Sequence, residues 1–137
     1  MSAGGHEWPP ITLVLDRSAV LAYVAGSIHA VEPVAEVVTD RQRVGITSVT
    51  VAEALALLAD PKGREDLHAL LGMAACAVLP TWGEDWLELA YWREVTSRAD
   101  LATTVRAALE HRASILTSEG HRYGDGLPVI HMPGQGP

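Results

Sequence analysis

Five short apolar segments alternate with longer helical patterns along this chain, and this alternation constrains the fold more than any other feature. The predicted strands cover residues 11–16, 44–48, 76–80, 114–117 and 129–132. The predicted helices cover residues 18–25, 30–43, 50–60, 64–74, 82–99 and 100–112. Short apolar strands joined by helices form parallel sheets that are covered on both faces. The sequence therefore predicts an α/β fold, a three-layer α/β/α sandwich with a central, mostly parallel sheet of four to five strands.

Length and composition are consistent with one domain. The chain has 137 residues, of which 48% are hydrophobic, and this is enough to build a core. We expect a single domain over residues 11–132, between a lead-in at 1–10 and a tail at 133–137 that are both rich in Gly and Pro. The lead-in lacks the segments of a signal peptide, and no apolar run reaches the roughly 18–20 residues that span a bilayer, so no membrane association is expected.

Cysteine content and net charge indicate the cellular setting and the kinds of ligand that the protein could bind. The only cysteine, Cys76, lies in an apolar run, which favours a buried thiol over a nucleophile and suggests a reducing, cytoplasmic setting. Seventeen acidic residues face ten basic ones, giving a net charge of −7. This balance opposes nonspecific binding of nucleic acid. It is compatible with acidic residues that hold metal ions.

Four carboxylates occupy positions where the predicted strands and helices meet. Asp16 ends the first strand, and Glu53 is predicted to lie in the first turn of the helix after the second strand. Asp100 opens the helix before the fourth strand, and Glu119 follows that strand. Ligands of open α/β sheets bind at the carboxyl edge of the strands, where these side chains are expected to converge. No basic partner is evident in the sequence, so the pattern favours a hard cation such as Mg²⁺ or Mn²⁺.

Each carboxylate also has an interpretation that involves local structure alone. Asp16 and Asp100 are suitable N-caps for the helices that follow them. Glu53 completes a capping box that would begin at Thr50. Glu119 fits a turn. The sequence leaves these interpretations open beside the metal site.

Three blocks of the sequence resemble the motifs of PIN-domain nucleases. "LVLDRSAVLAY" resembles the opening strand that ends in Asp-x-Ser, and "ITSVTVAEALALL" resembles the strand and helix that carry a Glu. "DLATTVRAALEHRASILTSEGHRY" resembles the third block, in which an Asp, an Ala-rich helix, a strand and Thr-x-acid follow one another. The blocks cover roughly half of the chain in the family's order. The small size is similar to that of VapC-type toxins of bacterial toxin–antitoxin pairs.

The resemblance implies a PIN-like fold and Mg²⁺- or Mn²⁺-dependent cleavage of RNA. By position, Asp16 and Asp100 would be direct metal ligands, Glu53 and Glu119 would be ligands directly or through water, and Ser18 would hold a water or position Asp16. It further implies a cytoplasmic toxin that forms a homodimer and pairs with a cognate antitoxin.

The chain departs from the family pattern at three points. Glu119 stands where Asp is more usual, Arg17 stands where a small or neutral residue is more usual, and the interval from Asp100 to Thr117 is about one residue longer than the commonest spacing. These departures keep a second interpretation open. In it, the chain is a catalytically decayed PIN-like domain that acts as a binding or scaffold protein.

Basic and aromatic residues complete the set of candidates. Arginines in segments near the predicted pocket would either contact backbone phosphates or be solvated surface residues; they are Arg17, Arg98, Arg106 and Arg122. Trp82, Trp86 and Leu89 are predicted to share one helix face, packed in the core or placed at a homodimer or antitoxin contact. The sequence has no His-x-x-His or Cys-x-x-Cys pairing and no phosphate-binding glycine loop. These absences argue against a zinc site and against a nucleotide-binding domain.

Overall fold

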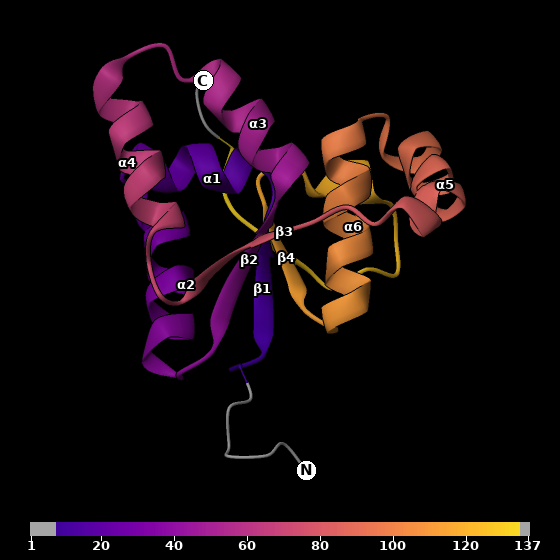
Figure 1. The fold of residues 1–137 in the computed structure, drawn as a ribbon, viewed down its shortest axis with the longest axis horizontal. Helices are drawn as coiled ribbons and strands as arrows, with labels where there is room; N and C mark the ends of the chain where they lie inside the picture. Colours follow the sequence, from indigo (N-terminus) through magenta and orange to yellow (C-terminus); the bar gives the residue numbers. More distant parts are fainter. Residues whose placement is uncertain (1–7, 135–137) are drawn as a thin grey trace.

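A five-stranded, wholly parallel sheet forms the centre of the protein (Figure 1). The computed structural model describes residues 8–134, so parts of the predicted lead-in and tail lie outside the described residues. The strands are β1 (Ile11–Leu15), β2 (Arg43–Thr47), β3 (Cys76–Leu79), β4 (Ser114–Thr117) and β5 (Val129–His131), in the spatial order β3-β2-β1-β4-β5. All five predicted strands are confirmed, with ends that differ by about one residue.

Helices cover both faces of the sheet, which confirms the predicted three layers. One face carries α1 (Arg17–Val24), α2 (Ile28–Thr39) and α4 (Pro61–Leu71). The other carries α6 (Ala99–His111), and α5 (Trp86–Thr96) packs against α6 on the side away from the sheet. The helix α3 (Ser48–Leu57) contacts both α1 and α6. Strand β1 lies between β2 and β4, and alternate residues of a strand face opposite sides of a sheet. Leu13 and Leu15 accordingly pack with the first group of helices, while Val14 packs with α6.

Helices α3 and α4 begin two and three residues earlier than the sequence predicted, because their caps lie further upstream. The Thr47 hydroxyl accepts a hydrogen bond from the backbone N–H of Thr50, so α3 begins at Ser48 and Thr50 is not its cap. Asp60 caps α4, and Pro61 occupies the first position of that helix rather than following the helix before it.

Helices α2 and α5 end four and three residues earlier than predicted, and each is followed within two residues by a residue in the left-handed backbone region. Arg41 (φ 57°) lies in the turn after α2, which ends at Thr39. Ser97 (φ 69°) ends α5, separating it from α6. The predicted long helix over 82–99 is further shortened at its start, where a 3₁₀ turn, η2 (Gly83–Asp85), precedes α5.

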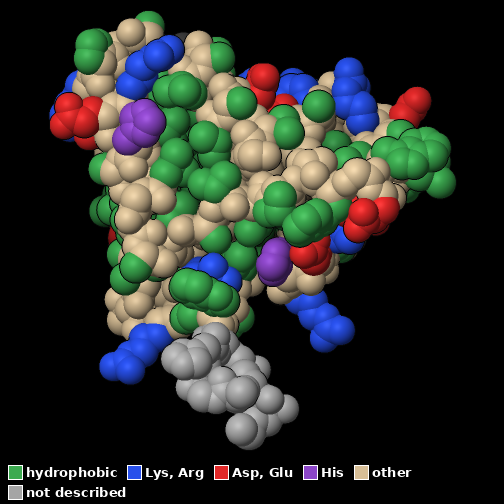
Figure 2. Space-filling model, viewed as in Figure 1, with side chains coloured by type: hydrophobic (Ala, Val, Ile, Leu, Met, Phe, Trp, Pro, Cys, Tyr) green, Lys and Arg blue, Asp and Glu red, His purple; other side chains and the backbone are tan. Residues whose placement is uncertain are grey.

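Trp82 and Trp86 are exposed, so the prediction that they pack in the core is wrong. Trp82 precedes the 3₁₀ turn and is 49% exposed, while Trp86 is 68% exposed. Leu87 and Tyr91 of α5 are exposed as well. Figure 2 shows hydrophobic side chains gathered over α5, at the right-hand end of this face. Within the described residues, no single helix has the length and apolar character needed to cross a membrane, although α1 and α2 pass that test as a pair bent by 97°.

Candidate acidic site

Asp16 follows β1 and is completely buried at the carboxyl edge of the sheet. Its Oδ1 accepts hydrogen bonds from the Ser18 hydroxyl (2.6 Å) and from the backbone N–H of Ala19 (3.0 Å). The second bond caps α1, so the N-cap interpretation is correct. Burial raises the pKa of the Asp16 carboxyl, and the hydrogen bonds from Ser18 and the other donors counteract part of that rise.

Ser18 connects the first strand to the loop after β4. Its hydroxyl donates to Asp16 and accepts a hydrogen bond from the backbone N–H of Ser118 (2.9 Å). Ser18 therefore holds Asp16 in place, which matches one of the two roles that the resemblance implied for it.

Tyr123 is a site residue that the sequence did not reveal. It ends the 3₁₀ helix η3 (Gly120–Tyr123), in a segment predicted only as a loop, and its side chain is 1% exposed. Its hydroxyl donates to Asp16 Oδ2 (2.7 Å). Burial and the nearby charges of Asp16, Asp100 and Glu119 raise the pKa of Tyr123 far above its usual value. The phenol therefore stays protonated and serves as a donor.

Asp100 and Glu119 share one guanidinium, that of Arg98. Arg98 Nε and Nη2 donate to the two Asp100 oxygens at 3.0 and 2.9 Å, while Nη1 and Nη2 donate to the two Glu119 oxygens at 2.9 and 3.2 Å. The Asp100 side chain is 3% exposed, and that of Glu119 is 22% exposed. Asp100 is the second residue of α6, which begins at Ala99, so the prediction that Asp100 caps this helix is wrong.

The charge of Arg98 sets the ionisation of both carboxyls. Burial acts to raise the pKa of Asp100 and that of Glu119, but the hydrogen bonds and charge of Arg98 outweigh it and hold both pKa values below their usual range. Arg17 contributes to both shifts, and Arg122 contributes to that of Glu119. Both groups are therefore ionised at neutral pH.

Glu53 lies further out than the sequence suggested. Because α3 begins at Ser48, Glu53 is its sixth residue and not a member of its first turn. Its side chain is 52% exposed and lies 3.6 Å from Arg17, an ion pair at the rim of the site. Arg122, at the same rim, donates to Glu119 Oε1 (3.2 Å).

The expectation that these carboxylates lack basic partners is therefore wrong for Glu53, Asp100 and Glu119, whereas Asp16 has only the uncharged donors described above. Four acidic side chains (Asp16, Glu53, Asp100 and Glu119) are accompanied by three arginines (Arg17, Arg98 and Arg122). The sequence does not predict these ion pairs. Arg17 and Arg98 each stand within two residues of a candidate carboxylate, but closeness in sequence does not determine the direction of a side chain.

A buried hydroxyl network anchors the start of α6. Thr47 and Thr103 hydroxyls lie 2.8 Å apart, and Thr50 and Thr104 hydroxyls lie 3.3 Å apart, joining the end of β2 and the start of α3 to α6. The Thr103 hydroxyl also donates to the Asp100 carbonyl (2.8 Å). The network fixes where Asp100 stands relative to the sheet edge, and no sequence signal distinguished these threonines from ordinary helix residues.

The acidic site has the donor chemistry of a hard-cation site. Asp100 and Glu119 present four carboxylate oxygens to a single positive group, and oxygen ligands are those that Mg²⁺ and Mn²⁺ prefer. The guanidinium of Arg98 is the positive group that these oxygens contact in the structure. Over residues 8–134, no three acidic, cysteine or histidine side chains form a cluster arranged to hold a metal. Asp16 is engaged by its own three donors.

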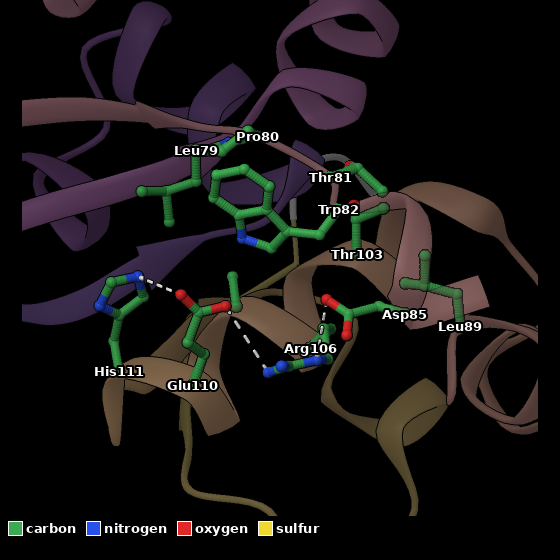
Figure 3. A pocket seen from close by; sticks show the side chains of 11 residues that line it. Leu79, Pro80, Thr81, Trp82, Asp85, Leu89, Thr103, Arg106, Glu110 and His111 are labelled. Carbon is green, nitrogen blue, oxygen red and sulfur yellow. Dashed lines mark ion pairs between the residues drawn. The ribbon is translucent and has the colours of Figure 1, made fainter. Parts of the chain in front are cut away.

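Arg106 lies elsewhere, so its assignment to the acidic site is wrong. Its guanidinium pairs with Asp85 (3.4 Å), Glu88 (3.3 Å) and Glu110 (3.7 Å), where α5 and α6 meet. Figure 3 shows Arg106 among Asp85 and Glu110, with the Trp82 ring across the cavity that they line. This cavity, of about 160 Å³, contains none of the four candidate carboxylates.

Comparison with known proteins identifies the fold. No protein-family model matches the sequence, and no curated protein matches it. Solved structures do match. A chain of VapBC2 from Rickettsia felis, bound to a DNA fragment from their promoter, is similar with a TM-score of 0.67 and 12% identity, over 88% of this chain and 98% of that one.

Two further structures give the same result. A chain of FitAcB from Neisseria gonorrhoeae has a TM-score of 0.59 and 19% identity, over 82% of this chain and 91% of that one. A chain of FitAB bound to an IR36 DNA fragment has a TM-score of 0.60 and 17% identity, over 88% and 94% of the two chains. The chain therefore has the PIN-like fold that its three sequence blocks implied.

Proposed function

We propose that the protein is a metal-dependent endoribonuclease and the toxin of a toxin–antitoxin pair. The observation that carries the proposal is the placement of Asp16, Asp100 and Glu119 around Tyr123 at the carboxyl edge of a PIN-like sheet. The similar chains belong to VapBC2 and FitAB toxin–antitoxin complexes, which supports the assignment to a toxin.

In this proposal Asp100 and Glu119 hold Mg²⁺ or Mn²⁺, and Asp16 completes the acidic wall. Held by these residues, the cation would supply a water of lowered pKa and a positive charge for the leaving oxygen of the phosphodiester. Ser18 and Tyr123 keep the Asp16 carboxylate fixed through hydrogen bonds of 2.6 and 2.7 Å. Preorganised charge of this kind stabilises a transition state without further reorganisation.

Substrate phosphates would meet the arginines at the rim. The side chains of Arg17 and Arg122 are 24% and 38% exposed, and each is paired with only one glutamate. Arginine forms bidentate hydrogen bonds to phosphate, so these two side chains are suited to hold an RNA backbone without reading its sequence. Glu53 then acts from the rim, through Arg17 or through water.

Partners and setting belong to the same proposal. The exposed face of α5 around Trp86, Leu87 and Tyr91 is apolar enough to be covered by a second copy of the chain or by an antitoxin. A homodimer in the cytoplasm is the expected form. Sedimentation at working concentration is expected to give twice the mass of the 14.6 kDa chain, and a monomer would contradict it.

Cleavage of an RNA pool in the presence of Mn²⁺ tests the activity. The wild type is expected to cleave, EDTA to stop it, and Asp16→Asn or Asp100→Asn to lower the rate at least about a hundredfold, the loss that follows removal of one preorganised electrostatic group. Asp40→Asn is the matched control, because Asp40 is exposed after α2, at the amino edge of β2. Cleavage that survives EDTA, or that Asp100→Asn retains, would contradict the proposal.

One observation favours a second candidate, a catalytically decayed PIN-like domain that acts as a binding or scaffold protein. The Arg98 guanidinium neutralises Asp100 and Glu119, the two carboxylates best placed to hold a cation. If no RNA is cleaved although Mn²⁺ binds, the second candidate replaces the first.

A further inference from the structure

Arg98 is the one arginine that bridges two candidate carboxylates in the described part of the chain. All four oxygens of Asp100 and Glu119 accept a hydrogen bond from its guanidinium. Arg122 reaches only Glu119, and Arg17 forms its ion pair with Glu53. A planar, bidentate arrangement of this kind is the strongest form of arginine–carboxylate pairing.

We propose that Arg98 is the resident counter-cation of the acidic site and that a divalent metal ion binds only by displacing its guanidinium from Asp100 and Glu119. This inference rests on the proposed function, because it concerns the cation that the nuclease would use. It adds a competition between a side chain of the protein and the metal for the same oxygens.

The geometry makes the two occupants exclusive. Mg²⁺ takes oxygen ligands at about 2.0–2.1 Å and needs them free of other strong donors. Each of these oxygens already has a charged donor at 2.9–3.2 Å. A metal ion between the two carboxylates would also stand next to the positive guanidinium, in a site that is only partly solvated.

The position of Arg98 allows it to leave without rearranging the core. It stands at the N-cap position of α6, where its carbonyl accepts a hydrogen bond from the backbone N–H of Ala102 (3.1 Å) but its side chain makes no cap, and it follows the left-handed Ser97. Its side chain is 21% exposed, so the guanidinium already borders solvent. Once released, it lies at the same rim as Arg17 and Arg122, where a substrate phosphate can replace the two carboxylates as its partner.

The competition predicts that metal affinity rises when Arg98 is removed. Mn²⁺ binding to the full chain, free of nucleic acid, is measured by titration calorimetry for the wild type, Arg98→Gln and Arg41→Gln. Arg98→Gln is expected to lower the Mn²⁺ dissociation constant by at least about tenfold, because the cation no longer displaces a bound competitor. Arg41→Gln removes the same charge from an exposed position before β2, at the opposite edge of the sheet, and is expected to stay within about twofold of the wild type.

A third variant keeps the test decisive if Arg98→Gln folds poorly without metal. Arg98→Lys keeps the positive charge but lacks the planar fork that bridges the two carboxylates. Its dissociation constant for Mn²⁺ is expected to fall between those of the wild type and Arg98→Gln.

The outcomes separate this inference from the proposed function. An unchanged or weaker affinity in Arg98→Gln and Arg98→Lys, with Mn²⁺ bound by the wild type, would overturn the competition and leave the nuclease proposal standing. Absence of Mn²⁺ binding in the wild type and in both Arg98 variants would overturn both.

Discussion

Two arginines of this protein each stand among several carboxylates, and the structure gives them different environments. Arg98 makes four hydrogen bonds of 2.9–3.2 Å to Asp100 and Glu119. Arg106 faces Asp85, Glu88 and Glu110 at 3.3–3.7 Å. Within the described residues, Asp85 Oδ2 and Arg106 Nε are buried atoms without a hydrogen-bond partner. The first group is tightly bonded and the second is a loose ion-pair cluster.

The difference follows from where the two groups sit in the fold. Asp100 lies at the start of α6, and Glu119 lies in the loop after β4. Both positions are at the carboxyl edge of the sheet, where loops and helix starts bring backbone and side chains together. Arg106 and Glu110 lie one turn apart on α6 and face α5. Composition alone therefore does not distinguish a site from a contact between helices, and the sequence assigned both arginines to the same pocket.

The largest difference between the two groups is expected in the free energy of unfolding of Arg98→Gln and Arg106→Gln. Arg98→Gln leaves Asp100, 3% exposed, without its charged partner and should lower the free energy of unfolding by about 2–3 kcal/mol. Arg106→Gln should cost about 1 kcal/mol or less, because its ion pairs are long and partly exposed. Urea denaturation at neutral pH without metal measures both. An equal loss in the two variants would remove the distinction between the groups.

A somewhat smaller effect is expected at Tyr123, which belongs to the tightly bonded group. Tyr123→Phe removes the hydroxyl that donates to the buried Asp16 and should cost about 1.5–2 kcal/mol. Asp16→Asn removes one buried carboxyl from the neighbourhood of Asp100 and Glu119, so the metal-free variant should be at least as stable as the wild type. In that background, Tyr123→Phe should cost less than about 1 kcal/mol. Equal costs in both backgrounds would show that Tyr123 acts through packing alone.

Acid should weaken the Arg98 group in a defined direction. The pKa values of Asp100 and Glu119 are lowered from 3.8 and 4.5, so their stabilisation is complete above pH 4.5 and is lost as the pH falls through the lower folded values. Arg98→Gln should flatten this acid limb, whereas Arg106→Gln should leave it unchanged. Unfolding free energies measured between pH 6 and pH 2.5 for the three proteins test this. Parallel curves for the wild type and Arg98→Gln would contradict it.

The smallest effect is expected at the rim. Glu53→Gln removes an ion pair of 3.6 Å from a side chain that is 52% exposed, and the stability should change by less than about 0.5 kcal/mol. Thermal denaturation with and without Mn²⁺ measures it. A loss comparable to that of Arg98→Gln would place Glu53 inside the tightly bonded group.

The sequence was sufficient for the order of strands and helices and for the positions of Asp16, Asp100 and Glu119. Asp16 and Glu119 follow apolar strands, and Asp100 lies at the start of the helix that precedes the fourth strand. The sequence did not reveal that the side chains of Arg98 and Tyr123 form hydrogen bonds to these carboxylates. Residue spacing does not determine side-chain rotamers, so a guanidinium two residues before Asp100 can turn to a carboxylate or to solvent. Tyr123 reaches Asp16 only because the loop after β4 forms a 3₁₀ turn.

Glu53 illustrates a third cause of error. Its predicted place in a first turn depended on where α3 begins, and helix ends are the least certain part of a sequence-based prediction. The hydroxyl of Thr47 moved that start upstream to Ser48. Glu53 is therefore the sixth residue of α3, where its side chain is 52% exposed and pairs with Arg17.

The competition between Arg98 and a divalent metal is tested most directly by locating Mn²⁺ in crystals of the wild-type protein from its anomalous scattering. A peak is expected between the carboxylates of Asp100 and Glu119, with the Arg98 guanidinium turned away from both. A structure at saturating Mn²⁺ with no peak there, and with Arg98 still bonded to both carboxylates, would contradict it.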